Sequence, residues 1–256
     1  MTTLSPVGST SLNVAGRNVP RPETRIPLSL WRELRQWMIQ NDADAAPMLK
    51  WAADEVSPPP HPEKMASEIV WIILCAGKTA QAARTIEKKV WDAIDQGRPV
   101  VAAFGHKARA AAIETVWRDR ERLFAELATK IGDEMALLEW CRGLPWVGEI
   151  TAFQLMKNFG VDCPKPDIWL CRLAGIPDRP GGHVETRFAA CRELCLPLAA
   201  ATGDRIAVVD SLLWLACNKG VLSVSPDGGP IDFRATPITA RPIIVQAETP
   251  QLEIWP

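Results

Sequence analysis

Between residues 28 and 220 the apolar side chains recur at the spacing of α-helices, which limits the chain to a mostly helical fold. In the segment SLWRELRQWMIQ, Trp31, Leu34 and Met38 fall on one helical face, with charged residues on the other. The apolar run EIVWIILCAG suits either a buried helix or a buried strand, and helix is favoured because no second strand candidate lies nearby. Glycines end five of the helical runs, at Gly97, Gly132, Gly143, Gly203 and Gly220. We therefore expect an all-α fold.

The two ends of the chain differ from this helical body. Residues 1–27 are rich in Ser, Thr, Pro and Arg without periodicity, which predicts a flexible arm or a strap on the surface. Residues 221–256 hold six prolines and short alternating apolar runs, a pattern typical of an extended tail. A chain of 256 residues that is 47% hydrophobic can bury one substantial core or two small ones. We expect residues 28–220 to form two helical lobes, flanked by irregular extensions.

Composition excludes several classes of site. The seven cysteines are dispersed and the three histidines lack ligand spacing, so we expect no metal and no cofactor. There is no run of about 18 apolar residues and no secretory signal, which predicts a cytoplasmic protein without a membrane partner, and we expect a monomer. The net charge of -1 gives no whole-chain signature of nucleic-acid binding, although residues 64–122 hold eleven Lys or Arg against seven Asp or Glu.

The segment GLPWVG separates a helix expected to end at Arg142 from one expected to begin at Glu149, so it predicts a tight helical hairpin over residues 143–149. Such a turn leaves backbone N–H groups unpaired at the N-terminus of the second helix, next to the positive end of the helix dipole. A phosphate of a nucleic-acid backbone fits there, with a hydroxyl from the second helix as a further donor and a lysine near its far end as a positive charge. The residues expected to contact DNA from this region are Pro145, Trp146, Val147, Gly148, Thr151 and Lys157.

Asp167 stands just ahead of the helical run IWLCRLAG, after a short segment with two prolines. An aspartate in this place ordinarily caps the helix by accepting N–H bonds from its first turn. Alternatively, a carboxylate held close to a bound phosphate backbone can stabilise a developing positive charge or orient a water molecule. The two roles are compatible on one residue, and spacing alone favours the cap.

The stretch LPWVGEITAFQLMKNFG, together with Asp167 and with Arg172 five residues further on, resembles the helix-hairpin-helix DNA glycosylases. That family has a Leu-Pro-Gly-Val-Gly-like hairpin, a second helix, and an aspartate that opens the next helix. The resemblance covers roughly residues 64–220. It implies a two-lobed helical architecture, with double-stranded DNA as the partner.

Weaker similarities extend the match. ILCAGKTAQAA, residues 73–83, is similar to the family's early helix and to the loop that inserts into DNA. FGHKARAAAI, residues 104–113, and VDSLLWL, residues 209–215, fall where related enzymes have similar segments. The resemblance makes Lys78 and Gln81 candidates for DNA contact, Gln81 by filling the space left by an extruded base, although a plain interhelical turn explains them equally well.

The chain departs from the family at three positions. Trp146 stands where the first hairpin glycine is usual, so the turn is expected to differ and an aromatic ring to project toward DNA. Ile150 occupies the place of the lysine that forms a Schiff base in bifunctional members, and Trp169 the place of a frequent histidine. The resemblance then implies a monofunctional enzyme: the base is extruded, water attacks the anomeric carbon, and Asp167 assists. An alternative is a lyase reaction in which Lys165 supplies the missing amine. The favoured interpretation of Lys165 is a solvated lysine in a loop.

The binding residues are expected to come from several segments. Arg172 is a further candidate for DNA contact through the resemblance, and tryptophans can stack on a base although most are core residues. An aspartate inside the apolar run AVVDSLLWLAC recognises the extruded base or, as is slightly favoured, is a helix cap or a buried partner of an arginine. The residues expected to line a base pocket are Trp169, Asp210 and Trp214.

Three classes of function remain open from the sequence. The favoured one is a DNA glycosylase that leaves an abasic site, acting in base-excision repair on damaged purines or in antiviral defence on hypermodified phage cytosines. The second is a non-catalytic helix-hairpin-helix module that clamps DNA. The third is a helical scaffold without a DNA partner, which predicts no salt-dependent affinity for DNA.

Overall fold

The protein is mostly helical, as expected. The computed structural model describes residues 25–78, 80–178 and 183–235. The helices in chain order are α1 (Leu28–Asn41), α2 (Ala45–Lys50), the π-helix η1 (Trp51–Glu55), α3 (Pro62–Cys75), α4 (Ala80–Asp95), α5 (Val100–Phe104), α6 (Lys107–Arg118), α7 (Arg120–Ala128), α8 (Glu134–Arg142), α9 (Glu149–Asn158), α10 (Ile168–Leu173), α11 (Val184–Thr202) and α12 (Ile206–Asn218). Two short antiparallel strands, β1 (Leu222–Val224) and β2 (Ile231–Phe233), follow them.

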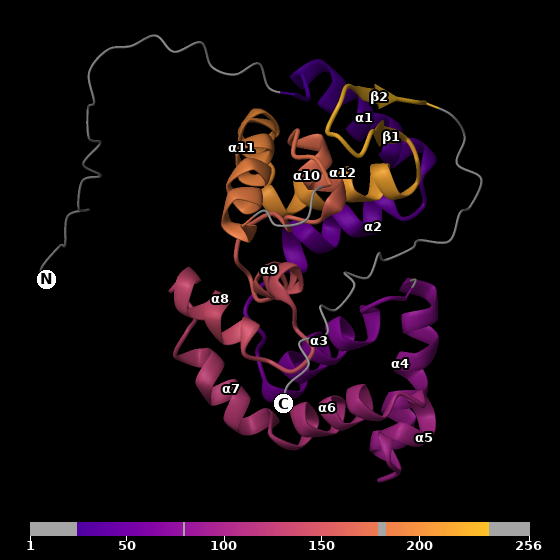
Figure 1. Ribbon diagram of the computed structural model, residues 1–256, viewed down its shortest axis with the longest axis vertical. Helices are drawn as coiled ribbons and strands as arrows, with labels where there is room; N and C mark the ends of the chain where they lie inside the picture. Colours follow the sequence, from indigo (N-terminus) through magenta and orange to yellow (C-terminus); the bar gives the residue numbers. More distant parts are fainter. Residues whose placement is uncertain (1–24, 79, 179–182, 236–256) are drawn as a thin grey trace, which may run out of the picture.

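The buried hydrophobic side chains form two clusters. Helices α3 to α9 surround one, which we call the α3–α9 core. Helices α10 to α12 share the other with α1, α2, η1 and β1, and we call it the α10–α12 core. Figure 1 shows the early helices α1 and α2 beside the late helices, so the chain leaves the second core at η1 and returns to it after α9. The return passes from Cys163, in the α3–α9 core, to Leu170, in the α10–α12 core, and Asp167 lies on this connection.

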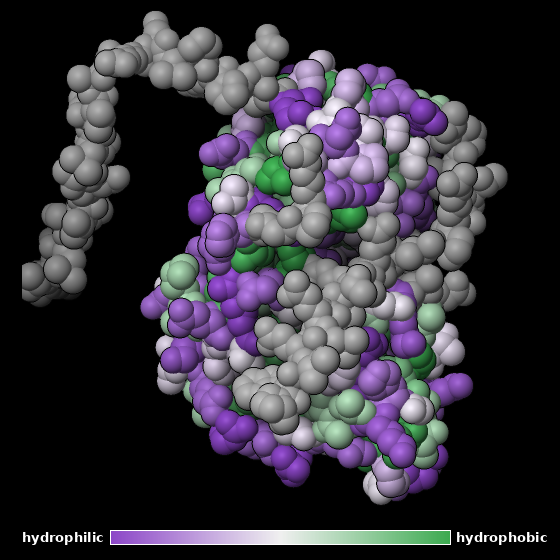
Figure 2. Space-filling view, in the orientation of Figure 1, coloured by the Kyte–Doolittle hydropathy of each residue, from purple (hydrophilic) through white to green (hydrophobic). Residues whose placement is uncertain are grey.

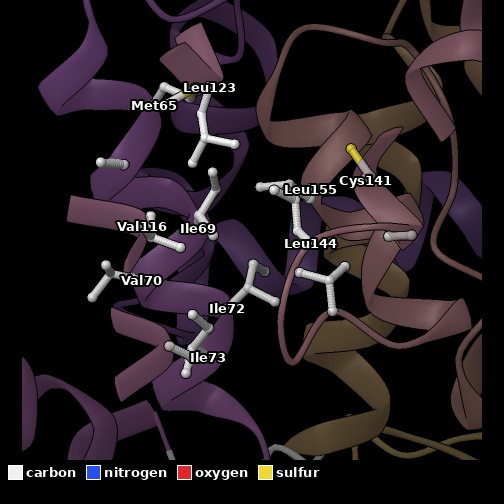
Figure 3. Close-up of a cluster of buried hydrophobic side chains, with 14 of the residues drawn as sticks. Met65, Ile69, Val70, Ile72, Ile73, Val116, Leu123, Cys141, Leu144 and Leu155 are labelled. Carbon is white, nitrogen blue, oxygen red and sulfur yellow. The ribbon is translucent and has the colours of Figure 1, made fainter. Parts of the chain in front are cut away.

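Helix α3 is the centre of the α3–α9 core. Figure 3 shows its buried residues, among them Ile69, Ile72 and Ile73, facing side chains from α6, α7 and α9. The apolar run that was ambiguous in the sequence is therefore a helix, surrounded on several sides by other helices. This packing explains why the run lacks the polar face of an amphipathic helix. It also fixes the position of α9, and with it the hairpin that precedes α9.

Several details differ from the sequence-based expectations. Helix α3 begins at Pro62, ahead of the apolar run EIVWIILCAG, with His61 accepting an N–H bond from Lys64. The short helices α2 and α5 and the π-turn η1 were not predicted, since runs of five or six residues carry little periodicity. The helix ends expected at Gly97, Gly143, Gly203 and Gly220 are confirmed to within two residues, whereas the helix expected to end at Gly132 ends at Ala128.

Both extensions are attached to the body where they are described. Arg25 donates hydrogen bonds to the carbonyls of Leu173, Gly228 and Gly229, and Ile26 is buried in the α10–α12 core. The described end of the first extension is thus held against the α10–α12 core, while residues 1–24 lie outside the described part. The second extension contains the β1–β2 hairpin, so the fold is all-α apart from a two-stranded sheet, and residues 236–256 lie outside the description.

The face of the molecule drawn in Figure 2 is mainly hydrophilic where it is described. Figure 2 shows hydrophilic residues over both ends of the molecule, with hydrophobic residues reaching the surface near the level where the two groups of helices meet. Among the helices of the described residues, none has the length and apolar character needed to cross a membrane.

Candidate functional site

The helical hairpin forms as the sequence predicts. Asp133 caps α8 by accepting N–H bonds from Met135 and Ala136, and α8 ends at Arg142. The turn is closed by hydrogen bonds from the Leu144 amide to the Cys141 carbonyl and from the Val147 amide to the Leu144 carbonyl. Pro145 and Gly148 are exposed on the turn, whereas Val147 is buried in the α3–α9 core, so its side chain anchors the turn and only its backbone is a candidate for DNA contact.

Trp146 adopts a left-handed backbone conformation with φ of 63°, and it is the only non-glycine residue with positive φ among those described. Only glycine takes this conformation without strain. The turn therefore holds a tryptophan at a position that favours glycine. The ring projects from the surface as expected, with 37% of the residue exposed.

We expect Trp146→Gly to unfold at a higher temperature than Trp146→Ala. Both variants remove the ring, but alanine retains a Cβ in the left-handed region, where it costs about 1 kcal/mol relative to glycine. Thermal unfolding of the two variants, measured side by side, checks this. Equal melting temperatures would mean that the turn does not hold a left-handed residue at this position.

The first turn of α9 presents backbone N–H groups that have no acceptor within the helix. The Thr151 hydroxyl does not add to these donors as expected, because it accepts the Gly148 N–H at 2.7 Å and lies 3.1 Å from the Gly148 carbonyl oxygen. Its role is to close the hairpin. The neighbouring Glu149 carboxylate lies 2.9 Å from the Arg142 guanidinium. The positive charge of Arg142 offsets the negative charge of Glu149, which would otherwise repel an anion at the N-terminus of α9.

Ile150, one residue into α9, is buried and apolar. No amine stands at this position to form a Schiff base. The side chain packs inside the protein, so a lysine placed there would need a cavity or a path to the surface.

Asp167 is the N-cap of α10, as expected, and it is also unusually enclosed for a cap. Its Oδ1 accepts the N–H groups of Trp169 and Leu170 at 3.0 and 3.1 Å, and only 12% of the side chain is exposed. Burial raises the pKa of the Asp167 carboxyl above its ordinary value, while the positive charge of Lys165 acts in the opposite direction. The second carboxylate oxygen, Oδ2, is not used by the cap.

Lys165 points toward this second oxygen. Its Nζ lies 3.9 Å from Asp167 Oδ2, and 18% of its side chain is exposed. Its backbone N–H donates to Asp210 Oδ1 at 3.1 Å, which fixes the loop that carries it. Lys165 is therefore not the solvated loop lysine that the sequence favoured, and the reason is that the loop lies folded between the two cores.

Lys157 and Asp210 form a buried ion pair and are not available to DNA or to a base. Both side chains are less than 5% exposed, and Lys157 Nζ contacts Asp210 Oδ2 directly. The prediction that Lys157 contacts DNA and that Asp210 lines a base pocket is therefore wrong for this structure. The alternative for Asp210, a buried partner of an arginine, is right about a buried ion pair but wrong about the cation, which is Lys157. The pair joins α9 to α12 and so connects the two cores.

The positions of the other candidate residues neither require nor exclude a contact with DNA or with a base. The Arg172 guanidinium binds both carboxylate oxygens of Asp178 and lies over the ring of Trp169, so contact with DNA requires that it leave this pair. Trp169 and Trp214 are half-buried and pack against the α10–α12 core, which gives them a structural role whatever else they do. The Gln81 side chain lies outside the described part of the chain.

Neither a reactive thiol nor a metal site is indicated among the described residues. All seven cysteines are free thiols, six of them buried, and burial raises the pKa of the half-buried Cys75 thiol to about 12. Within residues 25–78, 80–178 and 183–235 no group of three or more His, Cys, Asp or Glu side chains is placed to hold a metal ion.

Sequence reasoning missed two parts of this arrangement. It did not foresee that Lys165 faces Asp167, nor that His106 and Arg109 lie against Trp146. The sequence indicates only a weak similarity of the segment FGHKARAAAI to a segment of related enzymes. Its contact with the hairpin depends on packing between residues about 40 positions apart. Comparisons with protein-family models, with curated proteins and with solved structures gave no match to this chain.

Proposed function

We propose that the protein is a monofunctional DNA glycosylase in which Asp167 is the catalytic carboxylate. The observation that supports this most is the enclosure of Asp167: one oxygen caps α10 while the other faces Lys165, and 12% of the side chain is exposed. A cap alone does not require a buried carboxylate, because an exposed aspartate makes the same N–H bonds without losing its hydration. A raised pKa in a partly enclosed carboxyl is typical of a group used in chemistry.

The proposed reaction uses groups that the chain supplies. Backbone N–H groups at the start of α9 hold a phosphate of the DNA. The target nucleotide is extruded from the DNA duplex toward Asp167. The oxygen of a water molecule bonds to the anomeric carbon, the N-glycosidic bond breaks, and its electron pair leaves with the base. The Asp167 carboxylate stabilises the positive charge on the sugar and takes the proton of the water. The products are a free base and an abasic site.

Two observations favour hydrolysis over a lyase reaction. Ile150 provides no amine in the hairpin helix. Lys165 Nζ lies 3.9 Å from Asp167 Oδ2, so this amine is engaged with the carboxylate proposed to activate the water molecule. Borohydride trapping of a covalent adduct between the protein and DNA tests this directly: no adduct is expected, and an adduct lost in Lys165→Gln would establish the lyase alternative.

We expect Lys165→Gln to shift the acidic limb of the pH profile of base release to higher pH. The reaction needs the Asp167 carboxylate, so the rate falls as pH drops through the pKa of this group. That pKa is already raised by burial and lowered again by Lys165, so removing the lysine raises it further. Single-turnover base release between pH 4 and 9 checks the shift; a loss of activity at every pH would instead give Lys165 a direct chemical role.

A non-catalytic DNA clamp is the second candidate, because Asp167 does make both hydrogen bonds of a helix cap. The two candidates differ in one measurement, the release of a base by the wild-type protein. For the enzyme we propose either a damaged or a hypermodified base as substrate, in DNA repair or in anti-phage defence. A panel of duplexes carrying alkylated, oxidised, deaminated and glucosylated hydroxymethyl bases, with products identified by mass spectrometry, distinguishes these substrates.

A further inference from the structure

Five side chains from three segments form a continuous strip beside the hairpin, which we call the aromatic-cationic strip. The ring of Trp146 meets the ring of His106 edge to face with centroids 5.4 Å apart, and His106 is stacked on Phe104 at 6.1 Å. The Arg109 guanidinium lies 5.0 Å from the centroid of Trp146, and Lys78 Nζ lies 5.6 Å from the centroid of Phe104. Three rings are therefore joined in a row, with a cation over the ring at each end.

The strip reaches solvent instead of closing into the core. His106 is exposed, Trp146 is 37% exposed, and Phe104 and both cations are half-buried. Trp146 occupies this place although its backbone is in the left-handed region, which disfavours any side chain. A large apolar ring at a strained and exposed position contributes little to folding, so its presence points to a partner.

Arg109 is held in place from the protein side. Its Nη1 donates to the Ala76 carbonyl at 2.5 Å, and its Nε is shielded from water without a hydrogen-bond partner in the described structure. The guanidinium is thus fixed against the face of Trp146, and it ties the end of α3 to the hairpin. The strip is a preformed surface, which lowers the entropic cost of binding a flat ligand.

We propose that the aromatic-cationic strip is a stacking platform for an unpaired stretch of DNA strand. Aromatic rings in a row offer π-faces and edges to successive bases without selecting among them, and cations over the terminal rings attract the phosphates between the bases. A paired duplex buries its bases in its own stack, so the strip engages DNA where the strand is opened. The stacking platform deepens the proposed function and rests on it in one respect. Extrusion of the target nucleotide leaves its neighbours in the strand unstacked beside the hairpin, and these are the bases that the strip binds.

The test compares the binding of three DNA probes by fluorescence anisotropy: an oligothymidine single strand, a duplex with an unpaired central bubble, and the fully paired duplex. Wild-type protein is expected to bind the first two more tightly than the third. Trp146→Gly, which keeps the left-handed turn, should weaken binding to the single strand and bubble by roughly tenfold and leave the paired duplex within about twofold. Phe104→Ala, which alters no special backbone position, should act in the same direction.

Trp37→Ala is the matched control, because Trp37 is a half-buried tryptophan that packs against the other core, away from the strip. It should leave all three affinities unchanged. Equal binding of the bubble by wild type and Trp146→Gly would overturn the proposal, as would a loss of paired-duplex binding of the same size.

These measurements need no base release, so the two proposals can fail separately. If strip variants lose bubble binding and no base is released from any substrate, the platform stands and the glycosylase proposal fails. If base is released and strip variants bind the bubble normally, the glycosylase proposal stands and the platform is wrong.

Discussion

Replacing Asp167 with asparagine is expected to lower the rate of base release by at least about 10³-fold while DNA binding stays within about twofold. Asparagine has the same shape and caps a helix as well as aspartate does, so the bonds from the Trp169 and Leu170 amides are retained. What is lost is the negative charge that stabilises the sugar cation and accepts the proton. Single-turnover release of the free base and anisotropy with the same duplex measure the two effects.

The same variant is expected to be at least as stable as the wild type at neutral pH. A carboxyl whose pKa is raised on folding binds its proton more tightly in the native state. Stability therefore falls as pH rises from the ordinary aspartate pKa to the raised one, and the native state carries that cost at neutral pH. Asparagine has no charge to bury, so its advantage in melting temperature should shrink as pH is lowered through this window.

Asp133→Asn is the matched control. Asp133 caps α8 with the same pair of backbone N–H bonds, but it is exposed and stands at the start of a different helix. It should leave base release unchanged. Loss of base release in both variants would mean that capping, and not the Asp167 charge, controls activity.

Lys157→Met is expected to destabilise the protein by about 3–5 kcal/mol, the largest stability effect we expect from a single substitution. It leaves the Asp210 carboxylate buried without its cation. The double variant Lys157→Met, Asp210→Asn should recover much of this loss, because the asparagine is neutral and still offers an oxygen to the Lys165 N–H. Urea unfolding of the two variants and the wild type measures both quantities.

The pair between the exposed Lys64 and the half-buried Glu68 provides the comparison. Both residues lie on α3, and 52% of the Lys64 side chain is exposed. Lys64→Met should change stability by less than about 1 kcal/mol, because water screens the Lys64 charge and the remaining Glu68 carboxylate keeps its hydrogen bond from the Asn158 side-chain amide. If Lys157→Met is as mild as Lys64→Met, then the Lys157–Asp210 pair does not hold the two cores together, and the two residues become candidates for binding again.

The sequence was sufficient for features that depend on neighbouring residues. The hairpin follows from GLPWVG between two helical runs, and the cap role of Asp167 follows from its place before IWLCRL. The exposure of the Trp146 ring also follows from the sequence, because an aromatic side chain on a tight turn projects from the surface. In each case the determining contacts lie within a few residues of one another.

The rest depended on contacts between distant segments. Helical periodicity places Lys157 on a face of α9 but does not say that α12 covers that face, 53 residues further on. Lys165 looked like a loop lysine because the loop's position between the cores is set by the packing of both. The β1–β2 hairpin was read as an extended tail, since strands of three residues leave no periodic pattern.

Quantifying free base and abasic sites from the substrate panel, with wild-type protein and Asp167→Asn in parallel, tests the central claim most directly. The account predicts that wild type releases one modified base, leaves intact strands with abasic sites, and forms no borohydride-trapped adduct, while Asp167→Asn binds the same duplex and releases none. Equal base release by the two proteins would contradict the role of the carboxylate. Binding without release from any substrate by the wild type would contradict the enzyme itself and leave a DNA clamp.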